Sequence, residues 1–148
     1  EFVLNATETI FALALASNCH PEHHFKQAFA QIAKMGQVQF SEIYLIPCRD
    51  SVGADYWNAA CLLESKMSVE EMTSILKKME DEAGRVRPSH QISLDVDLIA
   101  WGEDLSHMQF NPKKLPLATD VKIPMLDVWQ STDFENETHK FPIVNWID

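Results

Sequence analysis

The feature that most constrains the fold of this chain is the alternation of apolar and acidic residues at positions 94–98, LDVDL. Successive side chains of a β-strand face opposite sides, so the three apolar residues would share one face while Asp95 and Asp97 share the other. Two aspartates on one strand face repel each other unless water or a cation lies between them. The pattern therefore predicts a strand over 92–101 with an apolar face and an acidic face.

The acidic face has two interpretations, and the spacing by itself leaves both open. In the first, Asp95 and Asp97 simply occupy the wet side of a half-buried strand. In the second they bind Mg²⁺, a hard cation that takes one or two carboxylates and leaves its other positions to water and phosphate oxygens. Arg85 and Arg87, a few residues upstream, would then be placed to meet those phosphates.

The clearest helix signal lies just before this strand. Ser68 and Glu71 have the spacing of a capping box, and apolar residues follow them at helical intervals. Gly84 suits a helix end because it can adopt the left-handed conformation that often terminates a helix. These residues predict a helix over 68–84.

Apolar runs, β-branched and aromatic residues, and turn residues predict the other elements. We expect a strand over 10–16, a helix from Pro21 to Gly36, a strand over 37–46 with a bulge near Glu42, and a strand over 56–65 that pairs with it.

The resulting order βαββαβ is typical of an α+β, ferredoxin-like fold, in which a four-stranded antiparallel sheet has both helices on one face and leaves the other face open. The aspartates would lie on that open face, where a ligand could rest. We expect a single domain over 1–148, with a core of about 9–102 and an irregular, proline-containing extension of about 103–148 that folds over it as loops or short helices.

Charge and cysteine usage exclude several classes of protein. The formal net charge is −10 with 12 lysines and arginines, which argues against a nucleic-acid-binding surface. No apolar run approaches the roughly 20 residues of a membrane span. The three cysteines lack C-x-x-C spacing, so they predict neither a disulfide framework nor a zinc site and favour a cytoplasmic setting.

Four short motifs occur in order, each in a suitable element: ASN at 16–18, YWNAA at 56–60, GRVR at 84–87 and LDVD at 94–97. With these motifs, over about residues 9–102, the chain resembles the 6-hydroxymethyl-7,8-dihydropterin pyrophosphokinase family of folate biosynthesis. Enzymes of that family move a pyrophosphoryl group from ATP to a pterin alcohol. The resemblance implies pterin and ATP as ligands and no nucleic acid or membrane partner.

The resemblance also implies roles for individual residues. Asp95 and Asp97 would bind two Mg²⁺ ions that bridge the ATP phosphates and the pterin hydroxyl oxygen, because phosphoryl transfer needs charge neutralisation and in-line positioning. Arg85 and Arg87 would belong to the catalytic loop, although Arg85 also suits a helix end as a favourable charge.

The pterin site would be formed by Pro47, Cys48, Tyr56 and Asn58. Tyr56 would offer a flat face to the ring and Asn58 a donor and acceptor pair to its edge. Pro47 matches the first residue of the family's Pro-Pro pair, and Cys48 stands in place of the second. Tyr56 is equally interpretable as a core aromatic residue and Asn58 as a strand-surface amide.

Several family positions differ here. Ile92 and Ser93 stand where an arginine is expected before Leu94, and Leu117 replaces the histidine of a Pro-His pair. A later arginine and a phenylalanine have no clear counterparts; Arg85, Arg87, His90, Lys122 or Trp129 would have to substitute. Two functions therefore remain open: a Mg²⁺-dependent pterin pyrophosphokinase, impaired if nothing substitutes, or a catalytically silent paralogue that acts as a ligand-binding or protein-interaction module.

A last cluster, Cys19, His20, His23 and His24, also has two interpretations. Imidazole and thiolate are ligands for transition metals. Neighbouring histidines on a helix point roughly 100° apart, however, and the alternative interpretation is that these residues are polar groups that line a loop.

Overall fold

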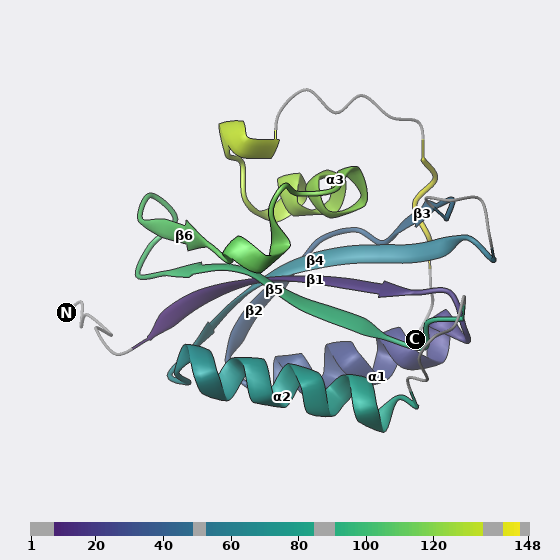
Figure 1. Cartoon of the computed structure of the whole chain (residues 1–148), viewed down its shortest axis with the longest axis horizontal. Coiled ribbons are helices and arrows are strands. Elements are labelled where there is room, and N and C mark those ends of the chain that lie inside the picture. Colours follow the sequence, from purple (N-terminus) through teal and green to yellow (C-terminus); the bar gives the residue numbers. More distant parts are fainter. Residues whose placement is uncertain (1–7, 49–52, 85–90, 135–140, 146–148) are drawn as a thin grey trace.

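The computed structural model describes residues 8–48, 53–84, 91–134 and 141–145. Figure 1 shows one antiparallel sheet between helices on both of its faces. In chain order the elements are β1 (Thr9–Ser17), α1 (Pro21–Ala33), β2 (Gln37–Phe40), β3 (Tyr44–Ile46), β4 (Tyr56–Ser65), α2 (Val69–Glu82), β5 (Asp95–Gly102), β6 (Met108–Phe110), the 3₁₀ turn η1 (Pro112–Lys114), α3 (Thr119–Val128) and the 3₁₀ turn η2 (Thr132–Phe134).

The sheet is built around β1, which pairs with β4 on one side and with β5 on the other. The strand order is β2-β4-β1-β5-β6, and β3 also pairs with β4. A four-stranded sheet was the wrong expectation, because the described residues form six strands. The extension contributes β6, and the strand predicted over 37–46 is divided in two.

Ser41 explains why the 37–46 segment forms two strands. Its backbone N–H donates to the Ala60 carbonyl, and its side-chain oxygen accepts from the Ala60 N–H, both at 2.8 Å. Ser41 thus pairs with both backbone hydrogen-bonding groups of Ala60, and its hydroxyl oxygen takes the place that a backbone carbonyl oxygen would have in a regular ladder. The ladder is interrupted there, between β2 and β3, close to the bulge expected at Glu42.

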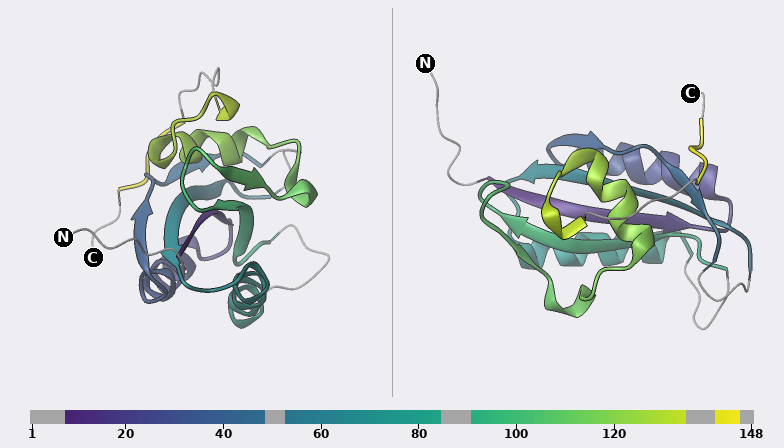
Figure 2. Two further views of the ribbon diagram at one scale, coloured as in Figure 1. Left: turned by 90° about the vertical axis from the view of Figure 1, so that its left-hand side faces the viewer. Right: turned by 90° about the horizontal axis from the view of Figure 1, so that it is seen from above.

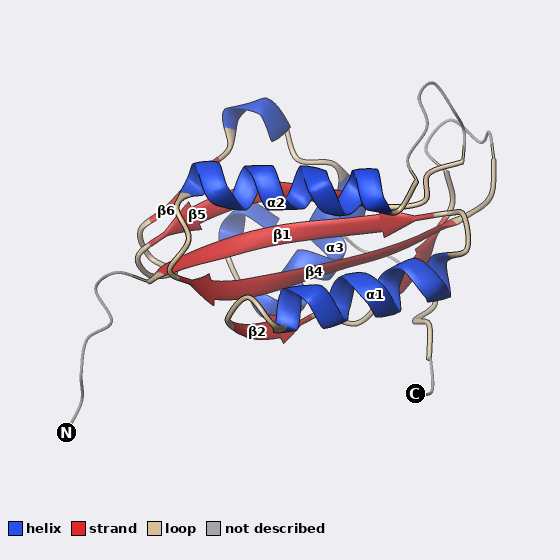
Figure 3. Cartoon of the chain, turned by 90° about the horizontal axis from the view of Figure 1, so that it is seen from below, coloured by secondary structure: helices blue, strands red, loops and turns tan. Residues whose placement is uncertain are grey.

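Helices α1 and α2 lie side by side on one face of the sheet (Figure 3), as predicted. Apolar side chains of β1, β4 and β5 face them and form the larger core. Its residues in or next to these strands are Phe11, Leu13, Leu15, Ala59, Cys61, Leu63, Leu94, Val96 and Leu98. The predicted apolar face is therefore confirmed for Leu94, Val96 and Leu98, although β5 begins only at Asp95 and not at residue 92 as expected.

The ends of these two helices also follow the sequence. The Ser68 side chain accepts from the Glu71 N–H at 3.0 Å, and the Glu71 carboxylate accepts from the Ser68 N–H at 2.9 Å, so the capping box is formed. Gly84 has a φ of 86° just beyond α2. Helix α1 ends at Ala33, earlier than predicted, and Gly36 passes so close to the Glu64 carbonyl that a side chain would not fit.

The opposite face is not open, which corrects the expectation. Figure 2 shows α3 lying across the strands on the side away from α1 and α2. Its Met125 and Val128 pack with Ala12 and Ala60 of the strands, in a second core that also includes Phe134. Alanines on this side of the sheet make room for a helix.

The alternation of side chains in strand β5 shifts by one residue halfway along, so residues of the two halves that are an even number apart face opposite sides of the sheet. Its register against β1 shifts between Ala12 and Leu13, and Ile99 is the extra residue. Ile99 and Ala100 consequently both belong to the α3 side, whereas Trp101 packs against the larger core. The half before the bulge keeps its acidic residues on the α3 side.

Among the helices that the structure describes, none has the length and apolar composition that crossing a bilayer requires.

Candidate functional site

Strand register brings the predicted site residues into two adjacent rows on the α3 side of the sheet. Ala16 of β1 pairs with Asn58 of β4 on one side and with Asp95 of β5 on the other. Two residues earlier, Ala14 pairs in the same way with Ala60 and Asp97. Because both central positions are alanine, the amide and the two carboxylates surround a shallow space rather than a filled core.

A cavity of about 370 Å³ lies over these rows. A volume in this range suits one small ligand such as a heterocycle. Its walls come from the two strand rows, from the segments before β4, and from the first turn of α3. The lining residues are Ala14, Leu15, Ala16, Cys48, Tyr56, Asn58, Asp95, Asp97, Asp120 and Val121.

The structure thus brings together five of the eight site residues predicted from the sequence. Cys48, Tyr56, Asn58, Asp95 and Asp97 all line the cavity, although they come from distant parts of the chain. Pro47 is exposed and is not among the lining residues. The other two, Arg85 and Arg87, and the substitute candidate His90, lie outside the described residues.

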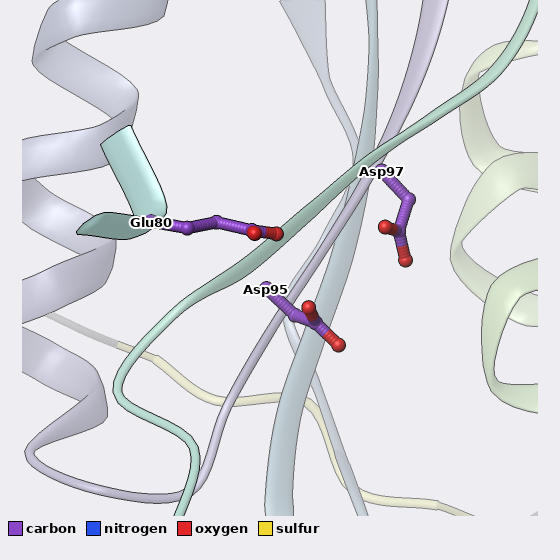
Figure 4. A group of neighbouring side chains, drawn as sticks. All are labelled: Glu80, Asp95 and Asp97. Atoms are coloured by element: carbon purple, nitrogen blue, oxygen red, sulfur yellow. The ribbon is translucent and has the colours of Figure 1, made fainter. Parts of the chain in front are cut away.

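A third carboxylate joins the two aspartates. Figure 4 shows the Glu80 side chain extending from α2 toward β5, near the part of the strand that carries Asp95 and Asp97. One oxygen of each carboxylate lies within 4.8 Å of the others. Three hard oxygen donors at this spacing suit a divalent cation such as Mg²⁺, so the residues fit the metal that the family resemblance implies.

Glu80 is held in place by the edge of the sheet. The backbone N–H of Val96 donates to its Oε2 at 2.8 Å. Burial, together with the nearby Asp95 and Asp97 carboxylates, raises the pKa of Glu80 to about 7, against the opposing effect of the Val96 hydrogen bond. A site that raises the pKa of a carboxyl group through neighbouring negative charge favours a bound cation.

The sequence contained a signal for Glu80. It follows the buried Leu76 by four residues and the buried Met79 by one, so it belongs to the face of α2 that turns toward the sheet. An acidic residue on the apolar face of a helix requires a partner. That partner lies on a strand 16 residues later, which helical spacing alone does not reveal.

Lys114 of η1 is the second residue that sequence analysis missed. Its ammonium nitrogen lies 3.0 Å from Asp97 Oδ1. No periodic pattern marks this lysine, because it lies in a short turn of the extension.

The ASN motif at 16–18 has a structural task. Asn18 Oδ1 accepts from the Ile92 N–H at 2.6 Å, and the Asn18 N–H donates to the Ile92 carbonyl at 3.0 Å. The Asn18 amide also donates to the Ala54 carbonyl at 3.3 Å. Asn18 therefore ties the approach to β5 and the approach to β4 to the end of β1, which positions both Asp95 and Tyr56.

Two expected substitutes for family residues do not reach the cavity. The position that needs a substitute is Ile92, where an arginine was expected, and its side chain is buried. Trp129 is also buried and stacks on Phe110 with ring centres 5.5 Å apart, inside the second core. Neither it nor Lys122 is a lining residue.

The Cys19–His24 cluster does not converge on a metal position. Within the described part of the chain, the three carboxylates are the one group of three such side chains with ligand atoms close together. His24 Nδ1 instead lies 2.8 Å from the Cys19 carbonyl oxygen. His20 and His23 line a separate hollow beside Trp57, so the transition-metal interpretation is not supported.

Comparison with known proteins agrees with the motifs. A family model described as 7,8-dihydro-6-hydroxymethylpterin-pyrophosphokinase (HPPK) matches residues 12–134. A search of curated proteins finds no match. The family match spans β1 through η2 and thus includes α3, which lies beyond the 9–102 segment of the resemblance. Because the match covers most of the chain, the protein belongs to the HPPK family.

Proposed function

We propose that this protein is a Mg²⁺-dependent pyrophosphokinase that transfers the terminal pyrophosphoryl group of ATP to 6-hydroxymethyl-7,8-dihydropterin. The single observation that supports this is the convergence of two separate motifs on one cavity. Tyr56 and Asn58 of one motif line it together with Asp95 and Asp97 of the other. A ring-binding half and a cation-binding half are what the reaction requires side by side.

The residues divide the work of the reaction between them. Tyr56 provides an aromatic surface and Asn58 a donor and acceptor pair for the pterin edge. Asp95, Asp97 and Glu80 hold Mg²⁺, which when bound neutralises phosphate charge and keeps the reacting groups in line. The pterin hydroxyl oxygen forms a bond to the β-phosphorus, the bond from that phosphorus to the α-phosphate oxygen breaks, AMP leaves and the hydroxyl proton is released.

The alternative is a paralogue that binds these ligands without transferring the group. The buried Ile92 favours it, because an arginine at this position would have contributed a cationic contact to the transition state. Loss of such a contact lowers turnover more than affinity, since it acts mainly on charge that develops during reaction.

Calorimetric titration with α,β-methylene ATP and hydroxymethylpterin, with and without Mg²⁺, tests binding. We expect Asp95→Asn and Asp97→Asn each to weaken Mg²⁺-nucleotide binding at least tenfold, about 1.4 kcal/mol. Asp81→Asn is the matched control, because Asp81 is exposed on α2 beside Glu80 and is not one of the three clustered carboxylates. Unchanged affinity in both site variants would remove the metal assignment.

Quenched-flow single turnover with saturating ATP then separates the two candidates. A chemical step as fast as that of a family member that has the full set of arginines would identify a working enzyme. Ligand binding without a measurable chemical step would identify the silent paralogue. Absence of pterin binding would overturn the proposed substrate itself.

A further inference from the structure

The ion pair between Lys114 and Asp97 places a cation of the chain itself at the acidic site. The Nζ to Oδ1 distance is 3.0 Å, and the two side chains are 36% and 31% exposed. They are partly withdrawn from water, so the pair is screened less than one on the open surface. Asp97 is at the same time one of the three carboxylates whose oxygens lie within 4.8 Å of one another.

The turn that presents Lys114 is fixed to the strand that carries Asp97. The Asn111 backbone N–H donates to the Ile99 carbonyl at 2.8 Å, and its side-chain amide donates to the Leu98 carbonyl at 2.9 Å. Asn111 Oδ1 in turn accepts from the Lys113 N–H at 3.1 Å, which caps η1. Lys114 is therefore attached to β5 immediately beyond Asp97, and its reach to the carboxylate is set by these bonds.

Charge repulsion indicates what such a lysine does. A second divalent ion at these carboxylates would have to use oxygens of Asp97 and would lie close to the Lys114 ammonium group, which repels it. Two metal ions about 3.5–4 Å apart also need oxygens that both ions can use. In this chain one Asp97 oxygen already contacts a cation.

We propose that Lys114 takes the place of one of the two divalent ions at the acidic site, so that the site binds a single divalent ion. The proposal deepens the proposed function, since it concerns the same three carboxylates. It also provides a positive charge next to the cavity in a chain that lacks the expected arginine before Leu94.

Titration with Mn²⁺, followed by the electron paramagnetic resonance signal of the free ion, tests this without nucleotide and without activity. We expect the wild type to bind one ion. Lys114→Met should bind Mn²⁺ about fivefold more tightly, the scale of a partly exposed ion pair, and should accept a second ion. Lys114→Arg should resemble the wild type because it keeps the charge.

Lys113→Met is the matched control, because it removes the same charge from an exposed neighbour in the same turn. It should leave both the affinity and the number of ions unchanged. Two ions in the wild type, no difference between the wild type and Lys114→Met, or an equal change in Lys113→Met would each overturn the proposal. Circular dichroism of each variant verifies that the fold is kept.

A second titration with α,β-methylene ATP separates this inference from the proposed function. One Mn²⁺ per nucleotide complex in the wild type and two in Lys114→Met would support both. If nucleotide does not bind at all while the nucleotide-free titration gives the expected difference, the pyrophosphokinase function fails and the role of Lys114 as a built-in cation stands. If nucleotide binds with two ions in the wild type, the function stands and the role of Lys114 fails.

Discussion

The two faces of the sheet are built from side chains of different size. On the side of α1 and α2, the strands present phenylalanine and leucine, for example Phe11 and Leu13, and these fill the space beneath the helices. On the side of α3, the same central strand presents Ala12, Ala14 and Ala16. The face toward α1 and α2 therefore supplies most of the buried apolar surface, whereas the small side chains on the face toward α3 leave space for a ligand.

The two faces also differ in how their helices are attached. Helices α1 and α2 are held mainly by apolar packing, with one hydrogen bond from Val96 of the sheet to Glu80 of α2, whereas the polar attachment of α3 involves three hydrogen bonds to one residue. Asp127 near its end accepts from the Tyr44 hydroxyl at 2.9 and 3.0 Å and from the Glu42 N–H at 3.1 Å. Ile123 of α3 also packs with Tyr44 and Ile46 of β3, so one carboxylate supplies the polar part of the connection between α3 and β3.

The largest expected effect would be on the packed face. Phe11→Ala removes a fully buried ring and should lower the free energy of unfolding by about 3–5 kcal/mol. Val121→Ala on the α3 side, where the side chain is half-buried beside the cavity, should cost about 1 kcal/mol. Urea denaturation measures the free energy of unfolding of both variants. Equal losses in the two variants would contradict the difference between the two faces.

The polar attachment of α3 comes next. Tyr44→Phe removes the hydrogen bonds to Asp127 and should cost about 1.5–3 kcal/mol near neutral pH, because the acceptor is charged. Burial, with the nearby Asp127 carboxylate, raises the pKa of Tyr44 above its ordinary value. Above about pH 10 the unfolded chain loses this proton while the folded protein keeps it, so the stability of the wild type falls as pH rises.

Tyr44→Phe lacks that proton, so the stability gap between the two proteins should narrow above about pH 10. Urea denaturation at neutral pH and near pH 11 measures the gap, and the buried Cys61 thiol contributes equally to both proteins. A gap that widens with pH would contradict the assignment of Tyr44 as a donor to Asp127.

Filling the cavity should affect ligand binding rather than stability. Ala16→Leu places a larger side chain between Asn58 and Asp95, and we expect pterin affinity to fall at least tenfold, about 1.4 kcal/mol. The unfolding free energy should change less than that, because the side chain enters a cavity and not a packed core. Ala33→Leu, on the exposed end of α1, is the control. Wild-type affinity in Ala16→Leu would show that the ligand binds elsewhere.

The smallest effect concerns the start of α2. Ser68→Ala removes the capping box and should lower the stability by about 1 kcal/mol. Ligand affinity should not change, because Glu80 lies near the opposite end of the helix. Ser74→Ala, exposed in the middle of α2, makes the same substitution without a cap and should leave the stability as it is. A drop in affinity in Ser68→Ala would mean that the packed face and the site are coupled through α2.

Local patterns predicted the elements whose signals are contained in a few neighbouring residues. The capping box predicted the start of α2, and the alternation at 94–98 predicted the two faces of the first half of β5, before the bulge at Ile99. Helix α3 was expected only in general terms, as part of an extension of loops or short helices, because Pro124 in its interior removes a backbone donor and its N-cap residue Ala118 provides no side-chain cap. Burial of its apolar residues against the alanines of the sheet overrides these local costs.

The candidate site was predictable to the same extent. Strand alternation put Asp95 and Asp97 on one face, whereas Tyr56 and Asn58 were expected from the family resemblance, and all four line the same cavity. Glu80 and Lys114 come from a helix and a turn outside the two strands, and only the folded chain brings them to the aspartates. Charge partners of this kind depend on tertiary distance, which neither spacing nor composition contains.

The hydrogen bond from Val96 to Glu80 also has a consequence for the free edge of β5. An uncovered strand edge is a template on which a second chain can add its own strand. At Val96 the outward-pointing N–H is already occupied by a carboxylate from α2, so an incoming strand would have to displace a charged side chain and would meet Asp95 and Asp97 beside it. The acidic residues that suit a cation thus also oppose the addition of a second strand at this edge of β5.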